Sequence, residues 1–381
     1  MSERLRIAVS GLAVTYPFGG VFWDYVQYPV GLARLGHDVL YLEDTGHWCY
    51  DPEAETFVED GSRNAARFAA ALGRLEPKLA TSWFYRDGGG RDYGRPWPEV
   101  AAFCRDADLF IHISASCWLQ EEYFSAKRVA FVDSDPIFTQ AAMNPVETLR
   151  RHDVFFTFAE NIGAPDCLVP ADVVEWVPTR QPIVLDAFVG RNGSPYRPVF
   201  TTVASWESTE GSSVVDGVEY GGKGVEFERF IDLPARSPVT LELALAGSPP
   251  ADRLRAHGWQ LRDAYEVSGD PWTYLDYLRD SLGEWSVAKN AYVASRSGWF
   301  SCRSACYLAL GVPAVVQDTG FGAAIPTGEG VLSFATLDEA GAAIEAVARD
   351  PRRHSQAARA IAEEYFDSEK VLSSLLEEAL R

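Results

Sequence analysis

Residues 286–317 read SVAKNAYVASRSGWFSCRSACYLALGVPAVVQ, and this stretch decides the fold. It contains Lys289, Arg296 and Arg303 but no Asp or Glu, although 54 of the 381 residues of the chain are acidic. The pattern predicts a helix, a turn with Gly298, a short helix and an apolar closing strand. A helix that starts after such a turn presents free N–H groups and the positive end of its dipole.

Two interpretations of this acid-free stretch are open. With two or three cations beside it, the helix start can hold a phosphate or a diphosphate, through Ser301, Arg303 and Ser304 with Lys289 nearby. The alternative is an ordinary buried βαβ segment that happens to lack acidic residues. The net charge of −20 favours the first, because an anionic ligand needs a locally basic pocket in so acidic a chain.

The composition is that of a soluble globular enzyme. Apolar residues make up 47% of the chain and charged residues 23%, and its length favours two domains. The net charge argues against a nucleic-acid partner and against an anionic membrane surface. The six cysteines are scattered without a CxxC pair, so free thiols in a reducing compartment are expected.

The N-terminus predicts neither export nor a membrane anchor. The opening residues, MSERLRIAVSGLAV, run straight into an apolar strand without the long apolar region and cleavage site of a signal peptide. No run approaches the roughly 18 apolar residues of a membrane-spanning helix. We therefore expect a cytoplasmic protein, and the sequence does not indicate its oligomeric state.

Short apolar runs alternate with helical patterns along the chain, which is typical of parallel α/β architecture. The first half predicts a helix at residues 21–35 and strands at residues 5–10, 38–42, 109–113, 129–132 and 154–158. The second half predicts helices after Lys223 and at residues 272–282, and strands at residues 199–205, 241–246 and 313–317.

A break rich in Gly, Pro and Asn at residues 190–198 separates the two halves. We therefore predict an α/β protein with two doubly wound domains, residues 1–190 and residues 191–356, hinged about a crevice. The C-terminal helices, at about residues 357–381, would pack back onto the first domain.

Candidate residues of the first half begin after its first strand. Gly19 and Gly20 lie between a strand and a helix, where a glycine pair either lets the backbone approach a ligand or forms a tight turn. Asp24 follows at the start of that helix and could accept a proton from an attacking hydroxyl. The alternative for Asp24 is an acidic residue that the helix dipole stabilises.

Three further polar residues follow strands of the same half. His47 comes after the second strand and could line the crevice. Asp133 and Asp135 end the strand that begins at residue 129, where they could bind hydroxyls or act as a base. A turn before Pro136 is the alternative explanation for Asp135.

In the second half, Lys223 lies in the glycine turn Gly-Gly-Lys-Gly, which opens a helix after the first strand. Its ammonium group could reach a phosphate, although the spacing is not that of a P-loop. Asp318, Thr319 and Gly320 close the strand after the acid-free stretch, where they could contact a sugar or simply form a turn. Neither a dinucleotide fingerprint nor a metal site is predicted.

Several motifs resemble those of GT-B glycosyltransferases of the family 1 and family 4 kind. Residues 31–39, GLARLGHDV, resemble their first helix–strand junction, and residues 298–313, GWFSCRSACYLALGVP, resemble their donor-site helix with its Gly-x-Pro turn. Residues 327–332, TGEGVL, resemble the segment that delivers the closing strand. Lys223-Gly-Val resembles a turn whose basic residue often binds the donor diphosphate.

The resemblance implies the GT-B fold, in which two Rossmann-like domains face a cleft. It also implies a nucleotide-diphosphate sugar as co-substrate, with no metal and no other cofactor. One position departs from the pattern: many GT-B enzymes bind the nucleotide ribose with a Glu five residues before the Gly of Gly-x-Pro, and this chain has Cys306 there. Arg303 and Ser304 are the candidates to make that contact instead.

The predicted function is transfer of a sugar to a small-molecule or natural-product acceptor, as in secondary metabolism. The donor would occupy the second domain, and the acceptor the first, where Trp23, Tyr28 and Trp48 could stack on it. Asp24 is the first candidate for the base. The alternatives are a non-catalytic two-lobed sugar- or nucleotide-binding protein and an NAD(P)-dependent oxidoreductase, which the missing fingerprint disfavours.

Overall fold

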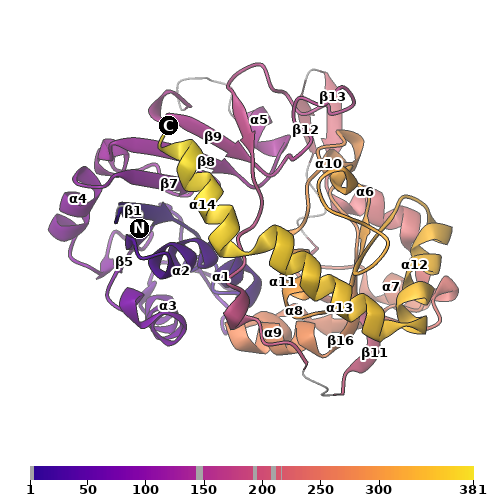
Figure 1. Ribbon diagram of the computed structural model, residues 1–381. Helices are drawn as coiled ribbons and strands as arrows, with labels where there is room; N and C mark the ends of the chain where they lie inside the picture. The colour runs from indigo at the N-terminus through magenta and orange to yellow at the C-terminus, as the bar shows by residue number, and fades with distance from the viewer. Residues whose placement is uncertain (1–3, 143–148, 192–194, 207–211, 216) are drawn as a thin grey trace.

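The computed structural model describes residues 4–142, 149–191, 195–206, 212–215 and 217–381, so part of the 190–198 linker lies outside the described residues. Two sheets lie side by side, each covered by helices (Figure 1). The α/β class that the sequence predicts is therefore confirmed.

The first sheet has the strand order β10-β9-β8-β7-β1-β2-β5-β6 and is parallel except for the β5–β6 pair. The strand order reverses between β7 and β1, which makes the carboxyl edge there a switch point of the kind at which open α/β sheets bind ligands. The strands are β1 (Arg6–Ser10), β2 (Asp38–Asp44), β5 (Trp83–Arg86), β6 (Asp92–Gly94), β7 (Leu109–Ile113), β8 (Arg128–Asp133), β9 (Val154–Thr157) and β10 (Trp176–Pro178).

The second sheet has the parallel order β15-β14-β11-β16-β17-β18. Its strands are β11 (Arg197–Ser205), β14 (Thr240–Ala246), β15 (Gln260–Asp263), β16 (Ser281–Ser286), β17 (Ala314–Gln317) and β18 (Val331–Phe334). Two hairpins extend from the sheets: β3 (Cys49–Asp51) with β4 (Thr56–Val58), and β12 (Ser212–Val215) with β13 (Val218–Gly221).

Helices connect the strands in both halves. In the first half they are α1 (Gly19–Tyr25), α2 (Gln27–Arg34), α3 (Ser62–Leu75), α4 (Trp97–Arg105) and α5 (Phe138–Ala142). In the second they are α6 (Lys223–Phe227), α7 (Ala251–Ala256), α8 (Ala264–Ser268), α9 (Pro271–Arg279), α10 (Asn290–Ala294), α11 (Cys302–Ala309) and α12 (Leu337–Arg349). The chain ends with α13 (Pro351–Ile361) and α14 (Ser368–Ala379). None of the described helices is long and apolar enough to cross a membrane.

Two expected elements differ in the structure. The single helix predicted at residues 21–35 is α1 followed by α2, because Pro29 has no N–H group to continue the hydrogen-bond ladder. The helix predicted at residues 272–282 ends at Arg279, and the fully buried strand β16 begins at Ser281. The sequence does not predict β16, because its residues, SLGEWS, include glycine, serine and glutamate, which are weak strand formers.

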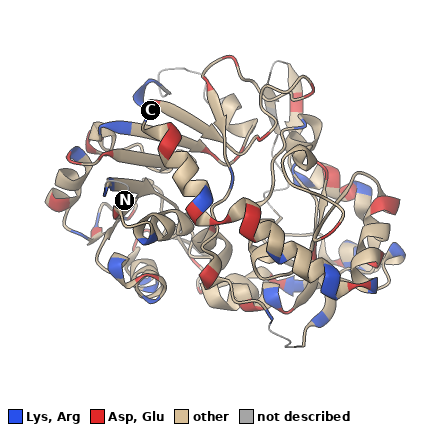
Figure 2. Cartoon of the chain, viewed as in Figure 1, with Lys and Arg blue, Asp and Glu red and all other residues tan. Residues whose placement is uncertain are grey.

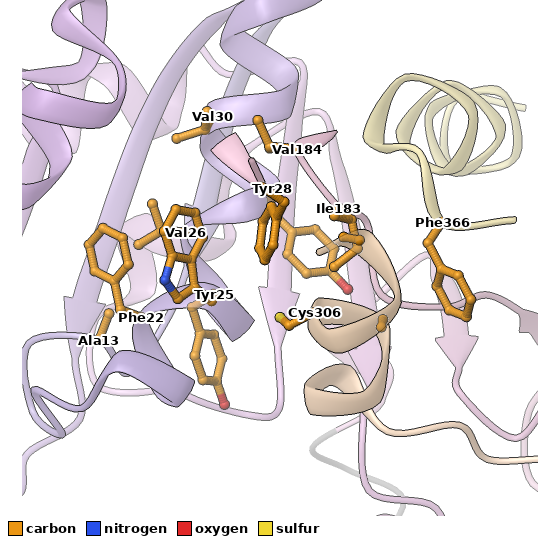
Figure 3. Packing of buried hydrophobic residues seen from close by; sticks show 14 of the residues in the cluster. Ala13, Phe22, Tyr25, Val26, Tyr28, Val30, Ile183, Val184, Cys306 and Phe366 are labelled. Carbon is orange, nitrogen blue, oxygen red and sulfur yellow. The ribbon is translucent and has the colours of Figure 1, made fainter. Parts of the chain in front are cut away.

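The two halves share one hydrophobic core. Side chains of α1 and α2 meet Cys306 of α11, Ile183 and Val184 of the connecting segment, and Phe366 between α13 and α14 (Figure 3). Figure 1 shows α14 returning over the first sheet, where it contacts α2 and β8. The domain boundaries stay a prediction, and so large a shared core argues against free hinge motion between the halves.

Candidate functional site

A pocket lies at the start of α11, where the carboxyl ends of β16 and β17 meet. Its empty volume is about 270 Å³, and no acidic side chain lines it. Ser301 precedes α11 without a side-chain cap, and the buried Ser304 hydroxyl has no hydrogen-bond partner in the described part of the chain. The lining comprises Ser286, Val287, Ala288, Trp299, Phe300, Ser301, Arg303, Ser304, Val316, Gln317, Thr319 and Phe321. The start of α11 therefore offers N–H groups and a spare hydroxyl to an anion.

Arg303 is held in place at this pocket by a buried carboxylate. Its Nε donates to Oε1 of Glu284 at 2.8 Å, and its Nη1 donates to the Val203 carbonyl at 2.8 Å. Glu284 is fully buried in β16, and its Oε2 has no partner among the described residues. Glu284 is not among the residues that the sequence predicts at this site, because β16 is not predicted, although Glu284 lies only two residues before the acid-free stretch.

Lys223 adds a second cation beside Arg303. Both line a neighbouring apolar pocket of about 390 Å³, whose walls include Phe227, Leu243 and Trp285. Burial, together with the positive charges of Arg303 and Lys289, lowers the pKa of Lys223 to about 7. The described residues provide no ion-pair partner for Lys223. The Lys223 ammonium group is therefore available to pair with an anion. Elsewhere, positive and negative residues are mixed along the outer helices (Figure 2).

Lys289 and Asp135 meet across the two halves. Lys289 Nζ lies 2.6 Å from Asp135 Oδ2 and 4.4 Å from the centre of the Phe138 ring. The Tyr292 hydroxyl also donates to Asp135. A residue expected at the donor and a residue expected as a base thus form one ion pair.

Asp133 and His47 occupy different surroundings. Asp133 is fully buried and accepts hydrogen bonds from Thr157 Oγ1 at 2.7 Å, from Gln140 Nε2 at 3.1 Å and from the Asp135 N–H at 2.9 Å. Burial raises its pKa, and these hydrogen bonds partly oppose the rise. His47 is exposed in the loop after β2. The structure therefore does not bring His47 and Asp133 together.

Asp24 lies in the last turn of α1, not at its start, so the dipole of its own helix disfavours its charge. Its carboxyl group accepts a hydrogen bond from the Cys302 thiol, at the start of α11. Burial raises the pKa of Asp24 to about 6, and this hydrogen bond limits the rise. Asp24 Oδ1 is buried without a hydrogen-bond partner in the described chain. The structure thus places Asp24 beside the helix start that borders the pocket.

Of the two adjacent glycines, Gly19 has a packing role that Gly20 does not share. A Cβ atom on Gly19 would lie 2.4 Å from Tyr274 Cβ and 3.0 Å from the Asp270 carbonyl, whereas one on Gly20 would lie 3.7 Å from the Tyr274 ring. Gly19 therefore lets α1 approach α9 closely.

The three aromatic residues expected at the acceptor are separated by burial. Trp23 and Tyr28 are each 1% exposed, and Trp23 Nε1 donates to the Pro271 carbonyl. Both pack in the shared core, so the structure does not support their stacking on an acceptor. Trp48, in contrast, is 54% exposed.

Residues 318–320 form a turn between the two halves. Asp318 Oδ1 accepts the Gly320 N–H at 2.8 Å, and the Gly320 carbonyl accepts a hydrogen bond from Asn161 Nδ2 at 3.0 Å. Thr319 lines the pocket, and its hydroxyl donates to the Trp299 carbonyl at 2.6 Å. Within the described ranges, no three His, Cys, Asp or Glu side chains are placed to hold a metal ion.

Comparisons with known proteins identify the fold. No family model matches the chain, and no curated protein matches it. Among solved structures, an alpha-glucosyltransferase in complex with UDP and a 13-mer DNA containing a central A:G mismatch is 12% identical, with a TM-score of 0.62 over 99% of this chain and 100% of that one. AviGT4, a glycosyltransferase involved in avilamycin A biosynthesis, is 12% identical, with a TM-score of 0.57 over 98% and 97%.

A third similar structure is Anabaena Alr3699/HepE in complex with UDP and glucose, which is 10% identical, with a TM-score of 0.55 over 98% of this chain and 99% of that one. These similarities extend over nearly the whole length of each chain at low sequence identity. The chain therefore has the GT-B fold, with two Rossmann-like units, as the sequence resemblance implied.

Proposed function

We propose that the chain is a glycosyltransferase whose donor is a nucleoside-diphosphate sugar. The observation that carries this proposal is the start of α11, where the Ser304 hydroxyl, without a partner among the described residues, lines one pocket and Lys223 lines the neighbouring one. Arg303 lines both pockets, and no acidic side chain lines either. A diphosphate supplies the negative charge and the acceptor oxygens for such a pocket. The similarity to structures that contain UDP supports the same assignment.

The ribose contact requires a residue other than the one at position 306. Cys306 is 3% exposed and faces the shared core (Figure 3). Arg303 and Ser304 lie on the same helix and line the pocket, so we assign the ribose contact to them.

The reaction follows from the two sides of the site. An acceptor hydroxyl forms a bond to the anomeric carbon as the bond between that carbon and the phosphate oxygen breaks, and the nucleoside diphosphate leaves with the electron pair. Arg303 and Lys223 stabilise the charge that develops on the diphosphate, without a metal ion. Asp24 accepts the proton of the hydroxyl if the anomeric configuration inverts.

The acceptor in this proposal is a small molecule. Net charge −20 opposes binding of a polyanion, although one similar structure contains DNA. The similarity to AviGT4 supports a natural-product acceptor and a place in secondary metabolism.

Calorimetric titration with UDP, dTDP and GDP tests the donor side, and release of the nucleoside diphosphate from a panel of nucleotide sugars tests the reaction. Lys223→Ala should weaken the preferred nucleotide roughly 10- to 150-fold, because a charge-assisted contact is worth about 1.5–3 kcal/mol. Lys370→Ala, whose lysine pairs with Glu364 on the surface, is the matched control. Absence of binding by all three nucleotides would remove the proposal.

Arg303 needs a second control. Arg303→Ala leaves Glu284 buried without its partner, which destabilises the fold by itself. Arg303→Ala combined with Glu284→Gln removes that charge, so its nucleotide affinity reports the loss of the guanidinium alone. Lys289→Ala should also weaken the nucleotide, and an unchanged affinity there would leave Lys289 with Asp135 as a contact between the halves only.

A further inference from the structure

Five aromatic residues form a continuous surface beside α1, where the two halves meet. We call Tyr16, Phe18, Tyr50, Phe57 and Tyr265 the seam aromatics. Phe18 lies 5.2 Å from Tyr50 and 5.6 Å from Tyr265 between ring centres, and Tyr50 stacks on Tyr265 at 5.8 Å. Phe57 continues the surface at 5.4 Å from Tyr50, and Tyr16 follows at 6.2 Å from Phe57. Phe57 is 48% exposed, so a ligand can reach the outer end of this surface.

The backbone beneath the seam aromatics is fixed by buried polar groups. The Glu43 carboxylate accepts the N–H groups of Val14 at 2.8 Å and of Thr15 at 2.5 Å. Asn64 Nδ2 donates to the carbonyls of Val14 at 3.0 Å and of Tyr50 at 2.9 Å. These bonds join the loop after β1 to the β3–β4 hairpin, so the half-buried rings and the exposed Phe57 ring lie on a preorganised backbone.

The position of this surface connects it to the proposed reaction. The β3–β4 hairpin follows the carboxyl end of β2, and Tyr265 follows the carboxyl end of β15. Phe18 directly precedes α1, the helix that carries Asp24. The seam aromatics therefore lie at the carboxyl edges of both sheets, the edges at which α/β proteins bind ligands.

The polar and charged groups around the seam aromatics indicate which kind of ligand they can bind. The Tyr50 hydroxyl donates to the Tyr265 hydroxyl at 2.8 Å, and Arg63 is engaged by Asp51 and Glu53, so these polar groups are already used within the protein. Asp263 caps α8 two residues before Tyr265, and Glu55 lies in the turn of the β3–β4 hairpin, so two carboxylates lie on the segments that carry the rings. Burial and the Tyr265 hydroxyl raise the pKa of Tyr50, and the negative charges of Glu55 and Asp263 add to the rise. Such a surface favours an apolar ring and disfavours an anion.

We propose that the seam aromatics, with Trp48, which directly precedes β3, bind the acceptor, and that the acceptor is a neutral aromatic alcohol. The identification of this ligand as the acceptor rests on the proposed function, whereas the prediction that the surface binds an aromatic ligand does not. A carbohydrate acceptor would require free hydrogen-bonding groups around the rings, whereas the Tyr50 hydroxyl and Arg63 are already paired within the protein.

Equilibrium dialysis of the full chain, with and without UDP, tests the inference. Three probes separate the chemistries: 2-naphthol as the neutral aromatic alcohol, 6-hydroxy-2-naphthoate as its anionic counterpart, and maltose as a carbohydrate. We expect 2-naphthol to bind more tightly than the other two. Phe57→Ala and Trp48→Ala should each weaken 2-naphthol about tenfold, since each removes one exposed ring face.

Tyr196→Ala, which removes a partly exposed ring elsewhere, is the matched control and should leave 2-naphthol binding unchanged. UDP affinity, measured in the same samples, should be equal in all variants. Tighter binding of maltose than of 2-naphthol, or unchanged 2-naphthol affinity in both Phe57→Ala and Trp48→Ala, overturns the inference and leaves the proposed function intact when UDP still binds. If UDP does not bind, the proposed function falls, and the dialysis without UDP still decides whether the seam aromatics bind an aromatic ligand.

Discussion

At the scale of single residues, the surroundings of the Asp24 carboxyl group suit proton transfer. It lies in the last turn of α1 and contacts Cys302 at the start of α11, and burial raises its pKa to about 6. A base with such a pKa is ionised at neutral pH and still accepts a proton readily. Its role as the base stays a prediction.

Asp24→Asn should lower turnover by roughly 100- to 10,000-fold while the affinity for the nucleotide stays the same.

The raised pKa of Asp24 also predicts how the variant changes stability. The folded state binds this proton more tightly than the unfolded chain, so ionisation of Asp24 destabilises the fold as pH rises from about 4 through 6. The melting temperature of Asp24→Asn at pH 8 should therefore equal or exceed that of the parent. Turnover and melting curves on this variant provide the test, and near-normal turnover would transfer the role to His47, Asp133 or Asp135, or indicate a retaining reaction without an enzymic base.

We expect the protein to take up a proton at Lys223 when it binds the nucleotide. Its pKa of about 7 means that the free protein holds it largely neutral at pH 8, and a bound diphosphate favours the ammonium form. Affinity should therefore fall as pH rises above 7, and close to one proton should be taken up at pH 8 but little at pH 6. Calorimetry in HEPES and in Tris, which differ in ionisation enthalpy, measures this uptake; equal apparent enthalpies at pH 8, or uptake that persists in Lys223→Ala, would contradict it.

At the scale of elements, the contact between α1 and α9 depends on a single missing side chain. Gly19 faces Tyr274 and the Asp270 carbonyl, whereas Gly20 has room for a methyl group. The adjacent glycines therefore provide a matched pair for a packing test.

Gly19→Ala should destabilise the fold by about 1–3 kcal/mol, because the added methyl group forces α1 away from α9. Gly20→Ala should change stability little or raise it slightly, since alanine is the better helix former. Urea denaturation of both variants gives the comparison. Equal stabilities would reject the packing role, and a loss of nucleotide affinity confined to Gly20→Ala would restore the alternative of a ligand-binding loop.

At the scale of the whole molecule, the two sheets are joined by a common core. The apolar cluster extends from β1 and β2 through α1 and α11 to α13 and α14. Figure 3 shows its middle, where residues of α1 and α2 lie near Cys306 and Phe366. The Ile183 N–H donates to the Phe366 carbonyl at 2.7 Å, and the Ser368 N–H donates to the Ile183 carbonyl at 2.9 Å, so the two connections between the halves also bind each other.

Thermal unfolding should therefore occur as one transition, with equal calorimetric and van't Hoff enthalpies, because neither sheet can unfold without exposing the shared core. Phe366→Ala should lower that single transition without splitting it, since Phe366 contributes to the same cluster. Differential scanning calorimetry measures both. Two resolved transitions in the parent protein would show that the halves are independent and would favour the hinged arrangement suggested by the linker.

The sequence alone determined the architecture and pointed to one candidate site. The acid-free stretch predicted α11 and β17, and the alternation of apolar runs predicted two doubly wound units, because helix and strand periodicity are local properties of the chain. The prediction placed Ser301, Arg303 and Ser304 at one helix start for the same reason. Glu284 was not part of this prediction, because the segment SLGEWS forms a strand through its burial and not through local strand propensity.

Only the tertiary structure decided which of these residues meet. Lys289 and Asp135 are 154 positions apart and pair across the halves, Asp24 reaches Cys302 on another helix, and Trp23 is buried by contacts from both units. Contacts of this kind depend on how the two sheets pack against each other. The hydrophobic periodicity of a short sequence segment does not determine that packing. The close approach of α1 to α9 at Gly19 is likewise a property of two surfaces, which is why the sequence left a turn and a ligand loop as equal explanations.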